Sequence, residues 1–274
     1  MQIARIPTVL FFLATFTVLC AWGNDEPVSE PTVYVDSHEM EYRFFPGGRI
    51  GISIETSGSL KIVGWDRGSV RVEAERRIYS QTEEKARTFL KTPPVRIRYT
   101  ETTSTIQVAD VPELGGLLEV NLIVYVPAAR TDLAAQTKKG DFIINAVNGW
   151  VEATIGEGNM DITTVNGYFS GRTTKGNILV NLSGNRWNGQ SFAAVTQAGN
   201  AELLLPENYS AALQLDTRNG EIAVDYPQQK VEGEFVPFEI TKRRDAQQLR
   251  ARVGDGGAPL HIGTQSGNVS LRRR

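Results

Sequence analysis

The sequence predicts an all-β fold, namely a single-stranded β-helix or solenoid with short strands and glycine turns, preceded by a β-rich N-terminal region that holds one short helix. Two observations carry this prediction. Between Thr137 and Asn181 a glycine recurs every nine residues, and an apolar residue stands two positions after each glycine. Further upstream, short segments alternate between apolar and polar residues, which is typical of strands with one buried face.

Composition narrows the functional classes. The chain has 274 residues, of which 41% are apolar and 22% charged, as in a globular protein. A net charge of −2 is too close to neutral to attract a nucleic acid. With one cysteine, Cys20, and two histidines, His38 and His261, the chain cannot form a disulfide framework or a thiolate zinc site. We therefore expect no metal, no cofactor and no nucleic-acid partner.

Residues 1–23 have the pattern of a secretory signal peptide. Arg5 precedes an apolar run, Val9–Trp22, which is shorter than a membrane-spanning helix, and small residues follow at Ala21 and Gly23. Lipoprotein anchoring at Cys20 is disfavoured because Leu19 stands before it. The pattern predicts export to the periplasm, the cell surface or the medium, with no transmembrane segment after cleavage. Residues 24–32 read as a flexible leader.

Residues 33–127 form the predicted β-rich N-terminal region. The segments 69–75, 95–99 and 118–126 alternate strictly and are expected to be strands. A helix is predicted near 81–91, because Ser80 and Glu83 match a capping box and prolines follow at 93 and 94.

Residues 128–274 form the predicted repeat region, continuous with the N-terminal part in one domain. The turns are assigned to a set of glycines: Gly140, Gly149, Gly158, Gly167, Gly176, Gly199, Gly220 and Gly267. The residues directly after the first five alternate between small polar side chains and aromatic ones: Asp141, Trp150, Asn159, Tyr168 and Asn177. The nine-residue period thus contains an eighteen-residue period.

Two architectures have this period. In a flattened solenoid each eighteen-residue coil holds two short strands, and equivalent strands lie over each other in parallel. In an antiparallel meander the glycines would be hairpin turns, which Asn-Gly also favours. We favour the solenoid, because recurring turns beside one another suit stacked Asn and aromatic ladders.

The ordered set of motifs resembles the bacterial family of exported β-strand-repeat domains known as putative adhesins, a family of unknown function. The resemblance rests on Val63-Gly64-Trp65-Asp66-Arg67, the Val126-Pro127 step, the Thr-Val-Asn-Gly and Thr-x-x-Gly-[Asp/Asn] repeats and the ending Val253–Gly257 with Thr264–Leu271. It covers roughly residues 33 to 272. The resemblance implies a single-stranded β-helix, an envelope or surface setting and no catalytic residues.

The candidate ligand-binding residues are the repeated turn residues. Trp150 and Tyr168, one coil apart, could stack on a sugar, although an aromatic ladder that only stabilises the edge explains them more simply. Asp141, Asn159 and Asn177 are likewise more simply turn residues than ligands. A calcium β-roll is rejected, because apolar residues fill the position where its Asp ligand would stand. A glycosidase is disfavoured, because Glu152 and Asp161 are expected on opposite faces.

These features predict a non-catalytic binding or adhesion module at a bacterial cell envelope or surface, whose partner is an unidentified glycan or protein. The alternative is a structural or regulatory envelope protein that binds another protein. A polysaccharide-active enzyme is the least favoured of the three.

Overall fold

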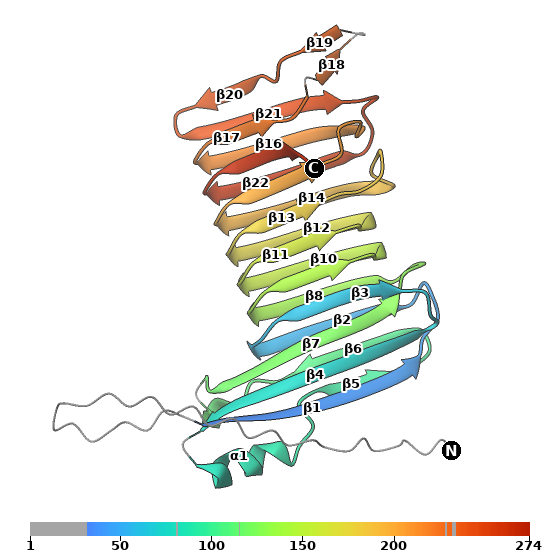
Figure 1. Ribbon diagram of the computed structural model, residues 1–274, viewed down its shortest axis with the longest axis vertical. Coiled ribbons are helices and arrows are strands. Elements are labelled where there is room, and N and C mark those ends of the chain that lie inside the picture. The colour runs from blue at the N-terminus through green and yellow to red at the C-terminus, as the bar shows by residue number, and fades with distance from the viewer. Residues whose placement is uncertain (1–31, 81, 115, 228, 232–233) are drawn as a thin grey trace, which may run out of the picture.

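The computed structural model describes residues 32–80, 82–114, 116–227, 229–231 and 234–274 (Figure 1). The predicted signal peptide and all of the predicted leader except Thr32 lie outside these residues. The chain is all-β, with one α-helix and one short 3-10 helix among the described residues. The strands of the N-terminal half are β1 (Thr32–Arg43), β2 (Arg49–Ser57), β3 (Leu60–Trp65), β4 (Ser69–Ser80), β5 (Arg96–Tyr99), β6 (Thr103–Val108), β7 (Leu118–Pro127), β8 (Asp132–Lys139) and β9 (Phe142–Asn145).

The repeats continue into the C-terminal half. Its strands are β10 (Asn148–Glu157), β11 (Met160–Thr163), β12 (Asn166–Lys175), β13 (Ile178–Asn181), β14 (Gly189–Ala198), β15 (Ala201–Leu205), β16 (Ala211–Asn219), β17 (Ile222–Asp225), β18 (Gln229–Val231), β19 (Glu234–Val236), β20 (Ile240–Arg243), β21 (Ala246–Val253), β22 (Pro259–Ser266) and β23 (Val269–Arg273). The helices are α1 (Glu83–Leu90) and η1 (Pro112–Leu114). All strands except β18 and β19 join one 21-stranded sheet, which wraps round a common core like a nearly closed barrel.

The sheet consists of two facing rows. A strand of the first row and the next strand of the chain, which lies in the second row, together make one unit, which we call a rung; a glycine turn joins the two strands in every rung except β6/β7, where η1 lies between them. The rungs are β6/β7, β2/β3, β8/β9, β10/β11, β12/β13, β14/β15, β22/β23 and β16/β17, in the order in which they stack. The rows also meet through a single pair, Ser57 and Glu119.

The rungs β8/β9, β10/β11 and β12/β13 pair in parallel with an eighteen-residue offset. Asn148 faces Asn166, and the register continues without a break to Ile155 opposite Thr173. The short strands follow the same rule, with Asp161 between Ile143 and Leu179. The predicted eighteen-residue register is confirmed here, and the antiparallel meander is excluded for these strands because the pairing is parallel.

The rungs do not stack in the order of the sequence, and this departs from a continuous single-stranded winding. The rung β2/β3 lies between β6/β7 and β8/β9, although β6 and β7 follow it in the chain. At the other end, β22/β23 lies between β14/β15 and β16/β17. Local spacing sets the register between neighbouring rungs but carries no information on which rung lies next to which.

Antiparallel strands extend the stack at both ends. In the second row β4 pairs antiparallel with β7, and β1 with β4. In the first row β5 pairs antiparallel with β6, and at the other end β21 pairs with β16 and β20 with β21. Figure 1 shows the parallel rungs between these two sets of strands, with α1 at the blue end.

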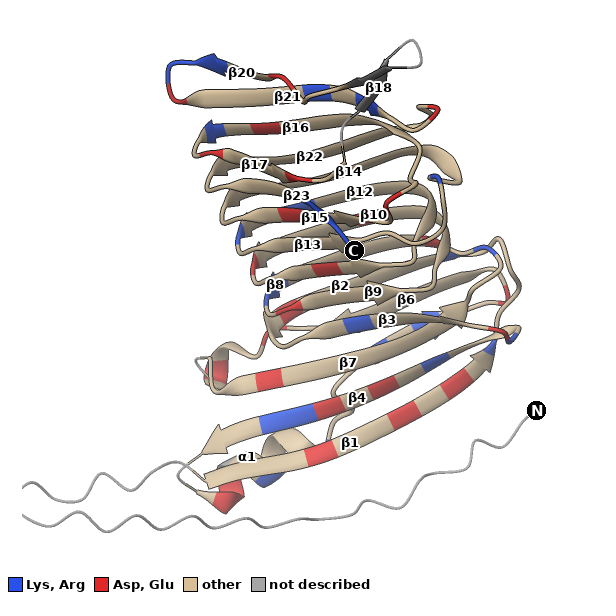
Figure 2. Ribbon diagram, turned by 45° about the horizontal axis from the view of Figure 1, so that its top comes forward, with Lys and Arg blue, Asp and Glu red and all other residues tan. Residues whose placement is uncertain are grey.

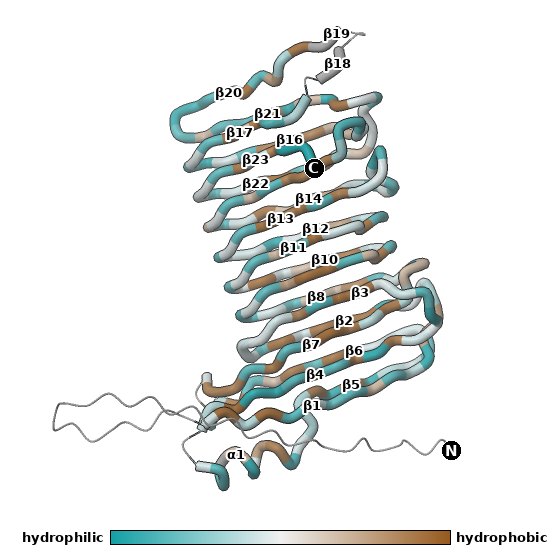
Figure 3. Tube along the Cα trace, viewed as in Figure 1, coloured by the Kyte–Doolittle hydropathy of each residue, from teal (hydrophilic) through white to brown (hydrophobic). Residues whose placement is uncertain are grey.

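The core lies between the two rows. Alternating side chains of the strands in the rungs point inward, among them Val151, Phe169 and Phe192 in the first row and Phe142 and Ile162 in the second. Figure 3 shows the resulting alternation of hydrophobic and hydrophilic residues along the strands. Phe169 stacks on Phe192 with a centroid distance of 4.8 Å, so aromatic rings also pair from rung to rung inside the core.

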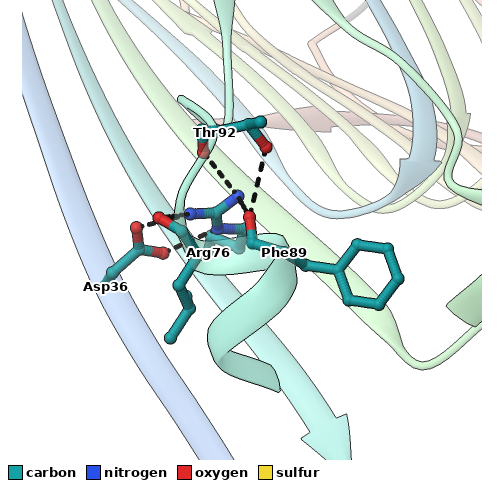
Figure 4. Close-up of polar contacts among 5 residues, drawn as sticks. Asp36, Arg76, Phe89 and Thr92 are labelled. Carbon is teal, nitrogen blue, oxygen red and sulfur yellow. Dashed lines mark hydrogen bonds and ion pairs between the residues drawn. The ribbon is translucent and has the colours of Figure 1, made fainter. Parts of the chain in front are cut away.

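The helix α1 is held at its C-terminal end by a buried arginine of β4 (Figure 4). Arg76 forms a two-point ion pair with Asp36 of β1, with both N–O distances 2.7 Å, and donates to the carbonyl oxygens of Phe89 and Thr92 at 2.9 Å. The predicted helix is present, but the predicted capping box is wrong. Ser80 is the last residue of β4 and donates its hydroxyl to the Thr82 carbonyl, while the N-cap residue Thr82 makes no side-chain capping bond.

Candidate functional site

The turn between the two strands of a rung carries a ladder of side-chain amides. The backbone N–H of Asn159 donates to Oδ1 of Asp141 at 2.8 Å, and that of Asn177 donates to Oδ1 of Asn159 at 2.9 Å. The ladder continues through Asn200 and Asn268 at 2.8 and 2.9 Å. Three of the predicted site residues therefore lie in one column, each with a carbonyl or carboxylate oxygen engaged by the next rung. Their predicted role as ligands stays a prediction.

The glycine before each of these residues permits close stacking. A Cβ atom on Gly158 would lie 2.0 Å from the carbonyl oxygen of Gly140, and one on Gly176 would lie 1.9 Å from that of Gly158. Both glycines have positive φ angles, +148° and +144°, which other residues rarely adopt. Threonine hydroxyls from the adjacent rung bond the same carbonyl oxygens, as Thr173 does to Gly158 at 3.1 Å. The turn glycines Gly199, Gly267 and Gly220 continue the column, and Gly149 and Gly167 form a second one at the other edge of the rungs.

The predicted aromatic pair is present on the outer face of the first row. Trp150 of β10 and Tyr168 of β12 are register partners, and their rings stack with centroids 3.8 Å apart and planes 20° apart. Trp150 is 44% exposed, and its indole N–H donates to Oε1 of Glu152 at 3.0 Å. The stack ends there, because Ser191 is the next residue in register after Tyr168.

Two shallow hollows lie on the same outer face. The first, about 290 Å³, has Gly51 and Ala134 among its floor residues and Gln136 and Glu152 at its sides. The second, about 360 Å³, lies over Val195 and Gly263 and is lined by Arg172 and Arg218. Thr154 lines both, so the hollows adjoin. We call the two hollows together the groove.

A histidine–aspartate pair lies at the side of the second hollow. Nε2 of His261 is 2.5 Å from Oδ1 of Asp216, and each side chain is about one-third exposed. Asp216 reaches the histidine across Gly263, where a Cβ atom would lie 2.9 Å from its Oδ2. The two residues are 45 apart in the chain, and only the insertion of β22 beside β16 makes them neighbours.

Carboxylates on the two rows do not converge. Glu152 lies on the outer face of the first row and Asp161 on the second, as expected. Among the described residues no group of three or more His, Cys, Asp or Glu side chains could hold a metal ion. Figure 2 shows acidic residues along β1, β4 and β7, where Arg71 lies 3.1 Å from Glu39 and 2.8 Å from Glu73. These charges therefore largely offset each other.

Tyrosines near the two ends of the stack have raised pKa values. Burial raises the pKa of Tyr42 to about 12, and its hydroxyl hydrogen-bonds Oγ of Ser104. Burial also raises the pKa of Tyr209 and of Tyr226 near the other end. On the surface, the hydrogen bond from Lys175 lowers the pKa of Glu157 and raises that of the lysine.

An apolar cavity of about 510 Å³ lies at the N-terminal end of the core. It is lined by Phe89 of α1, Leu114 of η1 and strand residues such as Val108 and Val120, with Arg76 at its side. No helix in the described ranges has the length and apolar character needed to cross a membrane.

Comparison with known proteins gives similar structures at low sequence identity. No family model and no curated protein matches the chain. A crystal structure described as a "putative cell adhesion protein" from Clostridium sporogenes is 13% identical, with a TM-score of 0.42, and the match covers 87% of this chain and 100% of that one. Two described as putative adhesins, from Bacteroides fragilis and Parabacteroides distasonis, are 9% and 10% identical, with TM-scores of 0.29 and 0.30. These matches cover 87% and 86% of this chain and 97% and 96% of those chains.

Proposed function

We propose that this chain is a non-catalytic binding module of the putative-adhesin type, a β-solenoid that is exported to a bacterial cell envelope or surface and binds a glycan there. The observation that carries the proposal is the stacked pair Trp150 and Tyr168, because a tryptophan that is 44% exposed and held rigid by a stacked neighbour is suited to bind the apolar face of a sugar ring.

The polar surroundings of the pair support the same function. Sugars need hydrogen-bonding groups beside the stacking surface, and Glu152 lies next to Trp150, with Gln136 and Thr154 lining the same hollow. The site is built on strands whose register is fixed by the rungs, so its geometry is set before a ligand arrives.

Glycan-array binding tests the proposal. The double variant Trp150→Ala/Tyr168→Ala is expected to lose the glycans that the unaltered protein binds. The matched control is Trp65→Ala/Tyr125→Ala, which removes the aromatic pair on the outer face of the second row, with centroids 5.2 Å apart. Equal binding by the unaltered protein and the first double variant, with both folded by circular dichroism, would refute the proposed site.

A second function has one observation in its favour. In the described part of the chain β1 pairs only with β4, which leaves one edge of a twelve-residue strand free to receive a strand from a partner protein. Successive N–H groups of a strand point to opposite sides. Of the two variants Glu39→Pro and Met40→Pro, one therefore removes a donor on the free edge and the other removes a donor to β4. If the variant that loses the free-edge donor keeps its fold but no longer pulls down an envelope protein, this alternative is supported.

A further inference from the structure

We infer that the ligand of the groove is a linear polysaccharide with anionic groups, carboxylate or sulfate, and that Arg172 and Arg218 bind these groups in the second hollow. The inference rests on the proposed function, because it specifies the class of glycan that the aromatic pair receives.

The shape of the groove indicates an extended chain. The two hollows share Thr154, and their lining runs across the strands of the first row from Thr105 of β6 to β16. Eight strands lie along that path, from β6 through β2, β8, β10, β12, β14 and β22 to β16. At about 4.8 Å for each step between strands this is roughly 34 Å, which is longer than a single sugar ring.

Small residues line the first hollow. Gly51 and Ala134 lie there together with the longer side chains of Gln136 and Glu152. In the second hollow Gly263 is buried, and the carboxylate of Asp216 lies over it. Trp150 flanks the first hollow through its bond to Glu152. Trp150 and Tyr168 lie on β10 and β12, in the middle of this path and on the strands that carry Thr154 and Arg172, so a chain in the groove would pass beside the aromatic pair.

The charge of the second hollow selects anions. Arg172 and Arg218 form no ion pair with any carboxylate in the described part of the chain, and both side chains are exposed. The one acidic residue that lines this hollow, Asp216, is hydrogen-bonded to His261, so the two arginines outnumber the carboxylates of the hollow. Two guanidinium groups without a protein counter-ion, placed beside hydroxyl and amide groups, are the arrangement that binds carboxylate or sulfate.

The probes are polygalacturonate and its fully methyl-esterified form, which share a backbone and differ in charge. Titration calorimetry at low ionic strength is expected to show at least tenfold tighter binding of the free acid. Arg172→Gln and Arg218→Gln are each expected to weaken binding of the acid about tenfold and to leave the ester unchanged. The control is Lys61→Gln, which removes the same charge from the exposed outer face of the second row and is expected to change neither affinity. Dextran sulfate against dextran repeats the comparison for sulfate.

The outcomes separate the inference from the proposed function. Trp150→Ala should weaken binding of both polygalacturonate forms, because it removes the stacking surface rather than a charge. If both forms bind equally, or if neither arginine variant differs from the unaltered protein, the anionic specificity is refuted, while loss of binding in Trp150→Ala keeps the glycan site. If Lys61→Gln weakens binding as much as the arginine variants, the attraction is a general charge effect and the inference is also refuted. If no glycan binds in the array either, the proposed function fails together with the inference.

Discussion

The rungs of the molecule and its N-terminal end are stabilised in different ways. From β8/β9 through to β16/β17 the same contacts recur at each turn, because each turn glycine packs on the glycine of the neighbouring rung and a side-chain oxygen accepts the next backbone N–H. At the N-terminal end the chain relies on individual contacts, such as those of Arg76 with Asp36 and the end of α1. Repetition thus supports the rungs, and specific side chains support the N-terminal end.

The largest effect should come from the N-terminal end. Arg76→Met removes a side chain that is 5% exposed and leaves Asp36 and the helix carbonyls without their donor. Loss of one partner of a buried ion pair costs about 3–5 kcal/mol, and we expect this loss in the free energy of unfolding by urea denaturation. Arg87→Met, which removes an exposed arginine paired with Glu83 on the same helix, should cost less than about 0.5 kcal/mol. If both variants lose the same free energy of unfolding, burial of Arg76 is not the cause of its contribution to stability.

A substitution in the glycine column should lower the free energy of unfolding somewhat less. Gly158→Ala places a Cβ atom 2.0 Å from a backbone oxygen at a φ of +148°, and we expect a loss of about 3 kcal/mol in thermal or urea unfolding. The control is Gly184→Ala, at a φ of +81° with no atom within 4 Å of the added Cβ, where the conformational cost alone is about 1 kcal/mol. If the two variants are equally stable, close stacking of the glycines is not required.

The amide ladder should contribute less per step than the glycine column. Asn177→Ala removes the acceptor of the Asn200 N–H, at 2.8 Å, and should lower the free energy of unfolding by about 1 kcal/mol. Asn177→Asp keeps an acceptor at the same place and should retain most of that stability. If Asp is as destabilising as Ala, the bond itself is not the cause.

The smallest effect is confined to alkaline pH and should again affect the ends first. A buried tyrosine is favoured in its neutral form, so with a folded pKa of about 12 against an ordinary value of 10.0 its stabilising effect is complete below pH 10 and is lost as the pH rises to 12. Hydrogen exchange between pH 10 and 12 should therefore show the strands near Tyr42 and Tyr209 opening before β10 and β12. Tyr42→Phe should reduce this pH dependence at the N-terminal end; an unchanged profile would assign it to another group.

The sequence predicted the repeat more completely than the ends. The nine-residue glycine spacing left the solenoid and the meander open, and the recurring turns favoured the solenoid. In the solenoid Trp150 lies beside Tyr168, and Asp141, Asn159 and Asn177 form one column, because both arrangements follow from neighbours eighteen residues apart. Burial of Arg76 could not be predicted, since its partners lie 13 to 40 residues away in segments without periodicity.

The groove was also beyond prediction from the sequence. Its second hollow combines Arg172 of β12 with Arg218 of β16 and Gly263 of β22, and its histidine–aspartate pair needs β22 beside β16. The spacing of the repeats does not predict that β22/β23 lies between two rungs that precede it in the chain. One weak signal for the position of β22 is present in the sequence. The segment Thr264–Asn268 is more similar to Thr196–Asn200 than the intervening segment Thr217–Glu221 is.

The position of β22/β23 has a consequence for the order of assembly during synthesis. The rung β16/β17 is made before β22/β23, but its strands pair with β14/β15 only through that rung, although Ser210 before β16 already bonds Asn185. We therefore expect the stack to grow rung by rung as far as β15, and β16/β17 to take its final place only after Leu271 is available. A nascent chain halted before that point would carry an open strand edge, which gives the cell a reason to keep such a chain unfolded until its synthesis is finished.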